Sequence, residues 1–133
     1  PDTQPLLETI DAAVSLKVGD NITTDHIMPA GAKILPLRSN IPKISEHCFA
    51  VCDEEFPARA KALGQSIIVG GANYGQGSSR EHAAIAIKAC GISCVIAEMP
   101  PMLLTAPMMM LLLGTVDCVN ELGEDQVSFL VFA

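Results

Sequence analysis

The residues best suited to chemistry form the run Gly75-Gln76-Gly77-Ser78-Ser79-Arg80-Glu81-His82. This run falls between a predicted strand and a predicted helix, where unpaired backbone N–H groups and the helix dipole favour anions. Arg80 would stand in the first helical turn, where a cation opposes the dipole by about 0.3–1 kcal/mol. A residue placed against the local field indicates a counter-anion, and a guanidinium group pairs with a carboxylate bidentately. We therefore interpret the run as a carboxylate-binding loop.

A purely structural interpretation explains part of the same run. Ser78 and Glu81 fit an S-x-x-E capping box, and the glycines permit the turn. Arg80 is left without an explanation in that interpretation. The run is not a Walker A loop, because no Gly-Lys-Ser/Thr follows, and it lacks the third glycine of the dinucleotide fingerprint. Nucleotide binding is therefore disfavoured.

A second polar cluster covers residues 20–26 and is followed by Arg38. Its Asp, Asn and Thr residues are ordinary turn formers, so the cluster alone is weak evidence for a site. A single histidine such as His26 is more often a surface or hydrogen-bonded residue than a ligand. Two arginines that flank small hydroxyl residues would nevertheless suit a polycarboxylate. We expect Arg38 and Arg80 to converge on one concave face, with Asp25 and His26 nearby.

The cysteines do not form a recognisable metal site. They include two C-x3-C pairs, the second interrupted by Gly91, and no C-x-x-C. His47 and His82 show no metal-ligand spacing with them, so we assign no metal to this chain. Buried free thiols in a reducing compartment are the expected state. The five cysteines are Cys48, Cys52, Cys90, Cys94 and Cys118.

Apolar runs and turn residues predict the elements that position these groups, and their alternation indicates an α/β fold. Residues 22–39 are expected to be mostly irregular with short extended pieces. A strand, a helix stopped at Gly91 and another strand predict a right-handed parallel crossover. The pattern from 45 to 63 permits helix, interrupted at Pro57. The predicted helices cover about 57–62 and 79–90, and the predicted strands cover 13–18, 66–69, 92–97, 115–119 and 127–132.

Composition narrows the function classes. The chain has 133 residues, enough for one domain, and a formal net charge of −7 with few aromatic residues. A broad nucleic-acid-binding face needs clustered positive charge, so this class is disfavoured. Residues 99–113 are apolar, but the stretch is too short and too rich in proline to span a bilayer. Because the chain begins at Pro1 without a signal pattern, we interpret residues 1–133 as a single domain that is a fragment, a cleaved subunit or an excised domain.

Five runs in register over residues 18–97 carry a family resemblance. They are Gly19–Ile27, Pro29–Gly31, Arg38–Ile41, Phe56–Lys61 and Gly71–Ala84. Together they resemble the C-terminal swivel domain of aconitase, and the N-Y-G-x-G-S-S-R-E-H run is highly specific. The Gly-Ser-Ser-Arg-Glu-His core is shared with the small subunits of isopropylmalate isomerase and homoaconitase, whereas the Thr-Thr-Asp-His-Ile run leans toward aconitase proper. The resemblance implies the swivelling β/β/α domain of this family.

The resemblance also implies residue roles. Ser78 matches the serine that acts as general base on the carbon next to a carboxylate. A serine hydroxyl is a weak base unless its alkoxide is stabilised, and the helix N-terminus and Arg80 would supply that stabilisation. The other matches are Ser79, Arg80 and Arg38 for substrate binding, and Asp25 and His26 for active-site residues facing the iron–sulfur cluster.

The activity implied is that of a hydro-lyase that interconverts citrate and isocitrate through cis-aconitate. A [4Fe–4S] cluster would be held by other domains or by a partner subunit, and would act as a Lewis acid on the leaving hydroxyl. The partners expected are a di- or tricarboxylate substrate and the cluster-bearing domains or large subunit, with no nucleic acid and no membrane. We expect a cytoplasmic protein, with the mitochondrial matrix as the alternative location. The alternative within the class is the small subunit of isopropylmalate isomerase or homoaconitase.

The sequence departs from the family after Ala97. The family continues there with a Ser-Phe-Ala-Arg-like run and a helix containing Asn, whereas this chain has Glu98-Met99-Pro100-Pro101-Met102. The alternative from another class is therefore a non-catalytic carboxylate-binding module. In either case we expect that the chain alone neither assembles a cluster nor turns over substrate, because a cubane cluster needs three or four convergent thiolates.

Overall fold

The computed structural model describes residues 10–78, 81–98, 113–114 and 127–131. The predicted strand at 115–119, Cys118, Ser79, Arg80 and nearly all of the apolar stretch at 99–113 lie outside the described residues. No helix in the described part is long and apolar enough to cross a membrane. In chain order the elements are β1 (Ala13–Lys17), α1 (Thr24–Ile27), the 3-10 helix η1 (Leu35–Leu37), α2 (Ile41–Ser45), α3 (Phe56–Leu63), β2 (Ser66–Ala72), α4 (Glu81–Ala89), β3 (Ile92–Glu98), β4 (Leu113–Gly114) and β5 (Val127–Val131).

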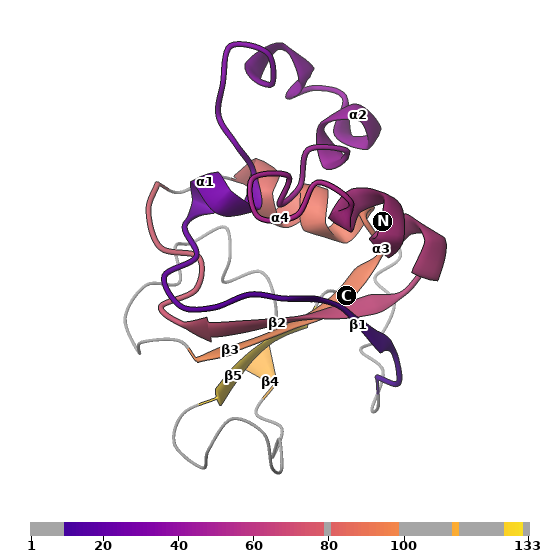
Figure 1. Cartoon of the computed structure of the whole chain (residues 1–133), viewed down its shortest axis with the longest axis vertical. Helices are drawn as coiled ribbons and strands as arrows, with labels where there is room; N and C mark the ends of the chain where they lie inside the picture. The colour runs from indigo at the N-terminus through magenta and orange to yellow at the C-terminus, as the bar shows by residue number, and fades with distance from the viewer. Residues whose placement is uncertain (1–9, 79–80, 99–112, 115–126, 132–133) are drawn as a thin grey trace.

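The strands form one five-stranded sheet in the order β1-β2-β3-β5-β4. β1, β2 and β3 are parallel, and β5 runs antiparallel to both β3 and β4. The β2-α4-β3 unit is the parallel crossover that the sequence predicts, and the α/β class is confirmed. Figure 1 shows α1, α3 and α4 on the same side of the sheet, with α2 farther from it, and α2 contacts α4. Because β1 and β2 are parallel, their carboxyl ends meet at one edge of the sheet.

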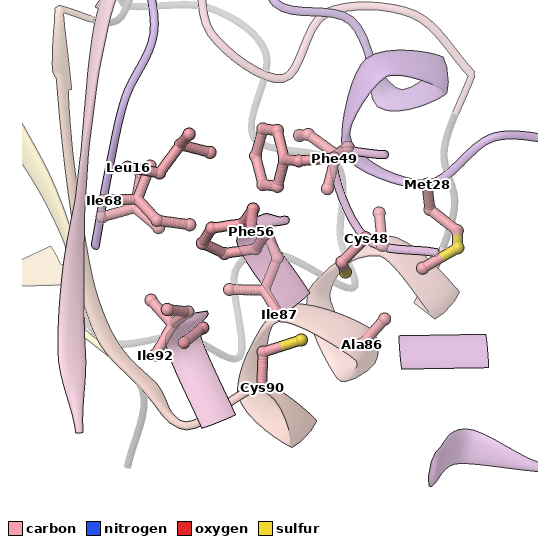
Figure 2. Close-up of a cluster of buried hydrophobic side chains, with 14 of the residues drawn as sticks. Leu16, Met28, Cys48, Phe49, Phe56, Ile68, Ala86, Ile87, Cys90 and Ile92 are labelled. Atoms are coloured by element: carbon pink, nitrogen blue, oxygen red, sulfur yellow. The ribbon is translucent and has the colours of Figure 1, made fainter. Parts of the chain in front are cut away.

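The core lies between the sheet and these helices (Figure 2). Phe49 and Phe56 pack edge to face, with ring centroids 5.3 Å apart and an interplanar angle of 79°. Leu16 and Ile68 contribute from the sheet and Ile87 from α4. Such T-shaped aromatic pairs are favourable beyond the apolar area that they bury. The core therefore holds α4 against the sheet, where it contacts β3.

Arg59 fastens α3 to the edge strand. Its Nε donates to the carbonyl of Ser15 on β1 at 3.0 Å, and its other guanidinium nitrogen pairs with Asp53. This hydrogen bond with Arg59 holds the pKa of Asp53 below its usual value. The pair is partly exposed, so it orients α3 more than it stabilises the fold.

Turn residues set the ends of α3 as the sequence predicts, although the helix begins one residue earlier. Pro57 lies in its first turn, and Gly64 caps its end with φ +75°. Three expectations need correction. The stretch 22–39 forms short helical pieces, α1 and η1, rather than extended ones, β2 extends to Ala72 instead of ending at Val69, and turns separate α2 from α3. β4, only two residues long, has no signal in the sequence.

Candidate substrate-binding loops

The two polar segments singled out in the sequence lie side by side beyond β1 and β2. We call residues 19–24 and 71–77 the paired loops. The amide of Asn21 donates to the carbonyl of Ala72 at 2.8 Å, that of Gly75 to Ile22 at 2.6 Å, and that of Thr24 to Gln76 at 2.9 Å. Segments about fifty residues apart in sequence thus form one unit at the carboxyl edge of the sheet. This is where open α/β sheets bind ligands.

Side chains complete the pairing. The Asp20 carboxylate accepts a hydrogen bond from the amide of Ala72 at 2.8 Å. Asn73 Nδ2 donates to Asn21 Oδ1 at 3.0 Å and to Gln76 Oε1 at 2.9 Å. A Cβ added at Gly71 would lie 2.1 Å from Asp20 Oδ1, so only glycine fits there. Asp20, Asn21 and Asn73 therefore build the loops, which agrees with their interpretation as turn formers.

His26 has a defined role at the start of α1. Its Nδ1 accepts a hydrogen bond from the amide of Thr23 at 2.9 Å, while its own amide donates to the Thr23 hydroxyl at 3.3 Å. These two bonds form a capping box with histidine in place of the usual Glu or Gln. Because Nδ1 acts as an acceptor, the neutral ring carries its proton on Nε2. His26 is therefore held as a hydrogen-bond donor through Nε2, and nothing in the sequence pattern indicated this cap.

The structure brings three of the predicted site residues into one region. Asp25 is exposed in the first turn of α1, beside His26, and Ser78 is exposed directly after the second of the paired loops. The second of the paired loops lies close to the start of α1 here, because a Cβ at Gly77 would lie only 3.2 Å from the Thr24 hydroxyl. Gly77 also has φ +115°, a backbone conformation that favours glycine. Ser78 is therefore presented next to the residues that begin α1.

The remaining predicted site residues are separate from this region or are not described. Arg38 is exposed at the end of η1, in the segment between α1 and α2 that extends away from the sheet (Figure 1). Ser79 and Arg80 lie outside the described residues, so the convergence of Arg38 with Arg80 stays a prediction. Within the described part, α4 begins at Glu81, close behind the paired loops. β2 ends three residues later than the predicted strand and α4 begins two residues later than the predicted helix, so the connection between them is one residue shorter than expected.

The burial of the cysteine thiols agrees only in part with the expectation. Cys48, Cys90 and Cys94 are buried and unoxidised, whereas Cys52 is exposed, contrary to the expectation of burial. Among the described residues, no group of three or more His, Cys, Asp or Glu side chains could hold a metal ion.

Tyr74, within the second loop, is a buried residue for which the sequence predicts no role. It is 5% exposed, its ring packs against Gly70, and burial raises the pKa of its phenol. Its hydroxyl finds no hydrogen-bond partner among the described residues. A buried hydroxyl without a partner costs about 1–3 kcal/mol.

We therefore expect Tyr74→Phe to raise the free energy of unfolding by about 1 kcal/mol, measured by urea denaturation of the full chain. The matched control is Phe56→Tyr, which adds a hydroxyl to a fully buried ring and should destabilise the protein. A loss of stability in Tyr74→Phe would contradict the assignment and show that the phenol has a partner.

The fold and the paired loops define the class of protein. Residues 35–99 match the family model of the aconitase C-terminal domain. The resemblance seen in the sequence is confirmed, and the mixed α/β architecture is that of the family.

Curated proteins that are similar in sequence to this chain include small subunits of one enzyme. The chain is 49% identical over 83 residues to the 3-isopropylmalate dehydratase small subunit of Halothermothrix orenii, and 51% identical over 83 residues to that of Syntrophus aciditrophicus. Each alignment covers 62% of this chain and 47% of the relative. The crystal structure of 3-isopropylmalate dehydratase from Methanocaldococcus jannaschii matches with a TM-score of 0.56 and 43% identity, over 66% of this chain and 48% of that one. The chain thus spans about half the length of the relatives it matches.

Proposed function

We propose that this chain is the swivel-domain part of an aconitase-family hydro-lyase of the 3-isopropylmalate dehydratase type, acting with a large subunit or with further domains. One observation carries the proposal. Close identity to small subunits of this enzyme coincides with a loop unit that presents Ser78 beside α1 at the ligand-binding edge of the sheet. The finding of these relatives favours this type over the citrate–isocitrate reaction expected from the Thr-Thr-Asp-His-Ile run.

In the proposed reaction Ser78 takes a proton from the carbon next to a substrate carboxylate. The electron pair of that C–H bond forms the new double bond while the neighbouring C–O bond breaks, and the leaving hydroxide takes up a proton to become water. Rehydration reverses these changes. His26, protonated on Nε2, would donate a hydrogen bond at the same edge. Arg80 would pair with a carboxylate and stabilise the serine alkoxide.

The [4Fe–4S] cluster that the family implies does not fit the described residues. A cubane cluster needs three or four convergent thiolates. Among the described cysteines, Cys48 and Cys90 are buried in the core, Cys52 is exposed, and Cys94 lies on β3. We therefore assign the cluster to the large subunit or to other domains, while this chain contributes the base and the carboxylate-binding groups.

The test is reconstitution. The full chain is mixed anaerobically with a cluster-bearing large subunit of the 3-isopropylmalate dehydratase type, and formation of the unsaturated acid is followed by its ultraviolet absorbance. Turnover of 3-isopropylmalate that requires both components is expected. Carboxylate binding without turnover on any hydroxy acid would instead support a non-catalytic binding module.

The citrate–isocitrate reaction stays as a second candidate because of one observation. Arg38 is an exposed cation at the end of η1, and citrate offers a third carboxylate where 3-isopropylmalate offers an apolar isopropyl group. A guanidinium group pairs well with a carboxylate and forms no such pair with an isopropyl group.

Substitution of Arg38 therefore distinguishes the two substrates. If citrate is the substrate, Arg38→Ala should lower kcat/KM by about 10–100-fold, the loss of one charge-assisted pair. If 3-isopropylmalate is the substrate, the same change should alter kcat/KM by less than about 3-fold, since the isopropyl group makes no charge-assisted pair. Lys33→Ala is the matched control, since Lys33 is another exposed cation in the same segment. An equal loss in both variants would show that only the general charge of the segment matters.

A further inference from the structure

The hydroxyl of Thr24, at the start of α1, is a buried polar group that the proposed site does not yet use. Thr24 is 6% exposed, its amide donates to the carbonyl of Gln76 at 2.9 Å, and its carbonyl accepts from the amide of Met28 at 2.9 Å. Its Oγ1 is shielded from solvent and has no hydrogen-bond partner among the described residues. The side-chain bonds that cap α1 belong to Thr23 and His26, so they do not explain the Thr24 hydroxyl.

An unpaired hydroxyl at this position is unfavourable for folding. A buried hydroxyl without a partner gives up the hydrogen bonds that it makes with water in the unfolded chain. Valine has nearly the same branched shape as threonine and would avoid this cost. A buried polar atom that no protein group satisfies therefore needs a reason, and a catalytic role is one such reason.

The Thr24 hydroxyl lies against the turn that carries Ser78. A Cβ added at Gly77 would meet Thr24 Oγ1 first, at 3.2 Å, and the Thr24 amide nitrogen next, at 3.9 Å. Consecutive Cα atoms are about 3.8 Å apart, so Ser78 begins one step beyond this contact. Gly77 has φ +115°, and a residue without a Cβ changes its backbone angles at little cost. Rotation about the Gly77 backbone can therefore bring the Ser78 side chain to Thr24 Oγ1.

We propose, on the basis of the function given above, that Thr24 is a positioning residue for the base. In the substrate-bound enzyme its hydroxyl donates a hydrogen bond to Ser78 Oγ, and the Thr24 proton stays on Thr24. The bond fixes the serine oxygen and stabilises the negative charge that it carries as an alkoxide. A donor that is already held in place and shielded from water needs no reorganisation when this charge develops. Thr24 thus adds a donor from α1 to the one that Arg80 would supply.

The test compares Thr24→Val, which keeps the branched shape but removes the hydroxyl, with Thr24→Ser, which keeps the hydroxyl. In the enzyme reconstituted with a large subunit of the 3-isopropylmalate dehydratase type, Thr24→Val should lower kcat by about 10–100-fold, as expected for one lost hydrogen bond to a charged oxygen. KM should change by less than about 3-fold, and Thr24→Ser should keep kcat within about 3-fold of the unsubstituted enzyme. In a Ser78→Ala background, Thr24→Val should cause no further fall in kcat, because the two side chains act as a unit.

A second measurement needs no partner subunit. Urea denaturation of the full chain should give Thr24→Val a midpoint equal to or above that of the unsubstituted chain, because the substitution breaks no hydrogen bond. The matched control is Ser15→Ala on β1, since the buried Ser15 hydroxyl accepts a hydrogen bond from Ser66 Oγ at 2.9 Å. Ser15→Ala should lower the midpoint and keep kcat within about 3-fold, the opposite of the result expected for Thr24→Val.

The outcomes separate this inference from the function on which it rests. An unchanged kcat for Thr24→Val, together with a large fall for Ser78→Ala, would overturn this inference alone. So would an additional fall in kcat in the Ser78→Ala background, or a lower urea midpoint for Thr24→Val, which would mean that the hydroxyl already has a partner in the isolated chain. Absence of turnover with the unsubstituted chain, or a normal kcat for Ser78→Ala, would overturn the proposed function of Ser78 and this inference with it.

Discussion

Replacing Ser78 with alanine in the reconstituted enzyme is expected to lower kcat by about 10²–10⁴-fold, the range typical of a lost general base. The physical reason is local. Ser78 is exposed and directly follows Gly77, the residue that approaches the Thr24 hydroxyl, so its side chain supports no packing and is free to face a ligand. Removal of its oxygen should leave the fold and the substrate affinity almost unchanged, because the paired loops are held by bonds among residues 19–24 and 71–77.

The test measures kcat and KM from initial rates at substrate concentrations up to saturation. Steady-state rates of the assembled enzyme should show a large fall in kcat with KM changed by less than about 3-fold, which is the mark of an interaction made only in the transition state. Ser93→Ala serves as the matched control, since Ser93 is a half-buried serine on β3 away from the loops. A fall in kcat below about 10-fold would remove Ser78 from the role of base, and a rise in KM of similar size would make it a binding residue.

Those parts of the fold that depend on local signals follow from the sequence. The end of α3 is encoded by Gly64, its start by Pro57, and the end of α4 by Gly91, and in the structure both glycines adopt positive φ. The strands that become β1, β2 and β3 are apolar runs bounded by such residues. α1 escaped prediction because it is only four residues long and its cap uses His26, a residue that capping patterns do not include.

The candidate site depends on contacts between distant segments, and these are not visible in periodicity. Nothing local shows that Asn73 bonds to Asn21, or that Gly71 must be glycine because Asp20 occupies the space of its Cβ. The resemblance to a family identified the residues but not the bonds between them. In the same way, Cys48 and Cys90 look like unrelated members of two C-x3-C pairs. In the folded chain both bond to the carbonyl of Ser45, the amide of Cys48 at 3.2 Å and the sulfur of Cys90 at 3.4 Å.

Gly91→Ala is expected to lower the free energy of unfolding by about 2–5 kcal/mol, a larger change than that expected for Tyr74→Phe. Gly91 has φ +82°, a conformation that costs an L-residue about 1–2 kcal/mol. A Cβ at this position would also lie 2.2 Å from the backbone carbonyl oxygen of Gly64, and a backbone atom cannot rotate away as a side chain can. The residue following Gly64 leads directly into β2, and the amide of Ser66 donates to the carbonyl of Gly91 at 3.2 Å.

The collision should therefore separate the start of β2 from the turn between α4 and β3. Urea denaturation of the full chain measures the loss, with Gly31→Ala as the matched control, because nothing lies within 4 Å of a Cβ at Gly31. Gly31→Ala should change the free energy of unfolding by less than about 1 kcal/mol. Equal stability of the two variants would mean that the close approach of Gly91 to Gly64 does not exist in solution. Since α4 is anchored at this turn and begins just after Ser78, that outcome would also weaken the placement of the catalytic serine proposed for this chain.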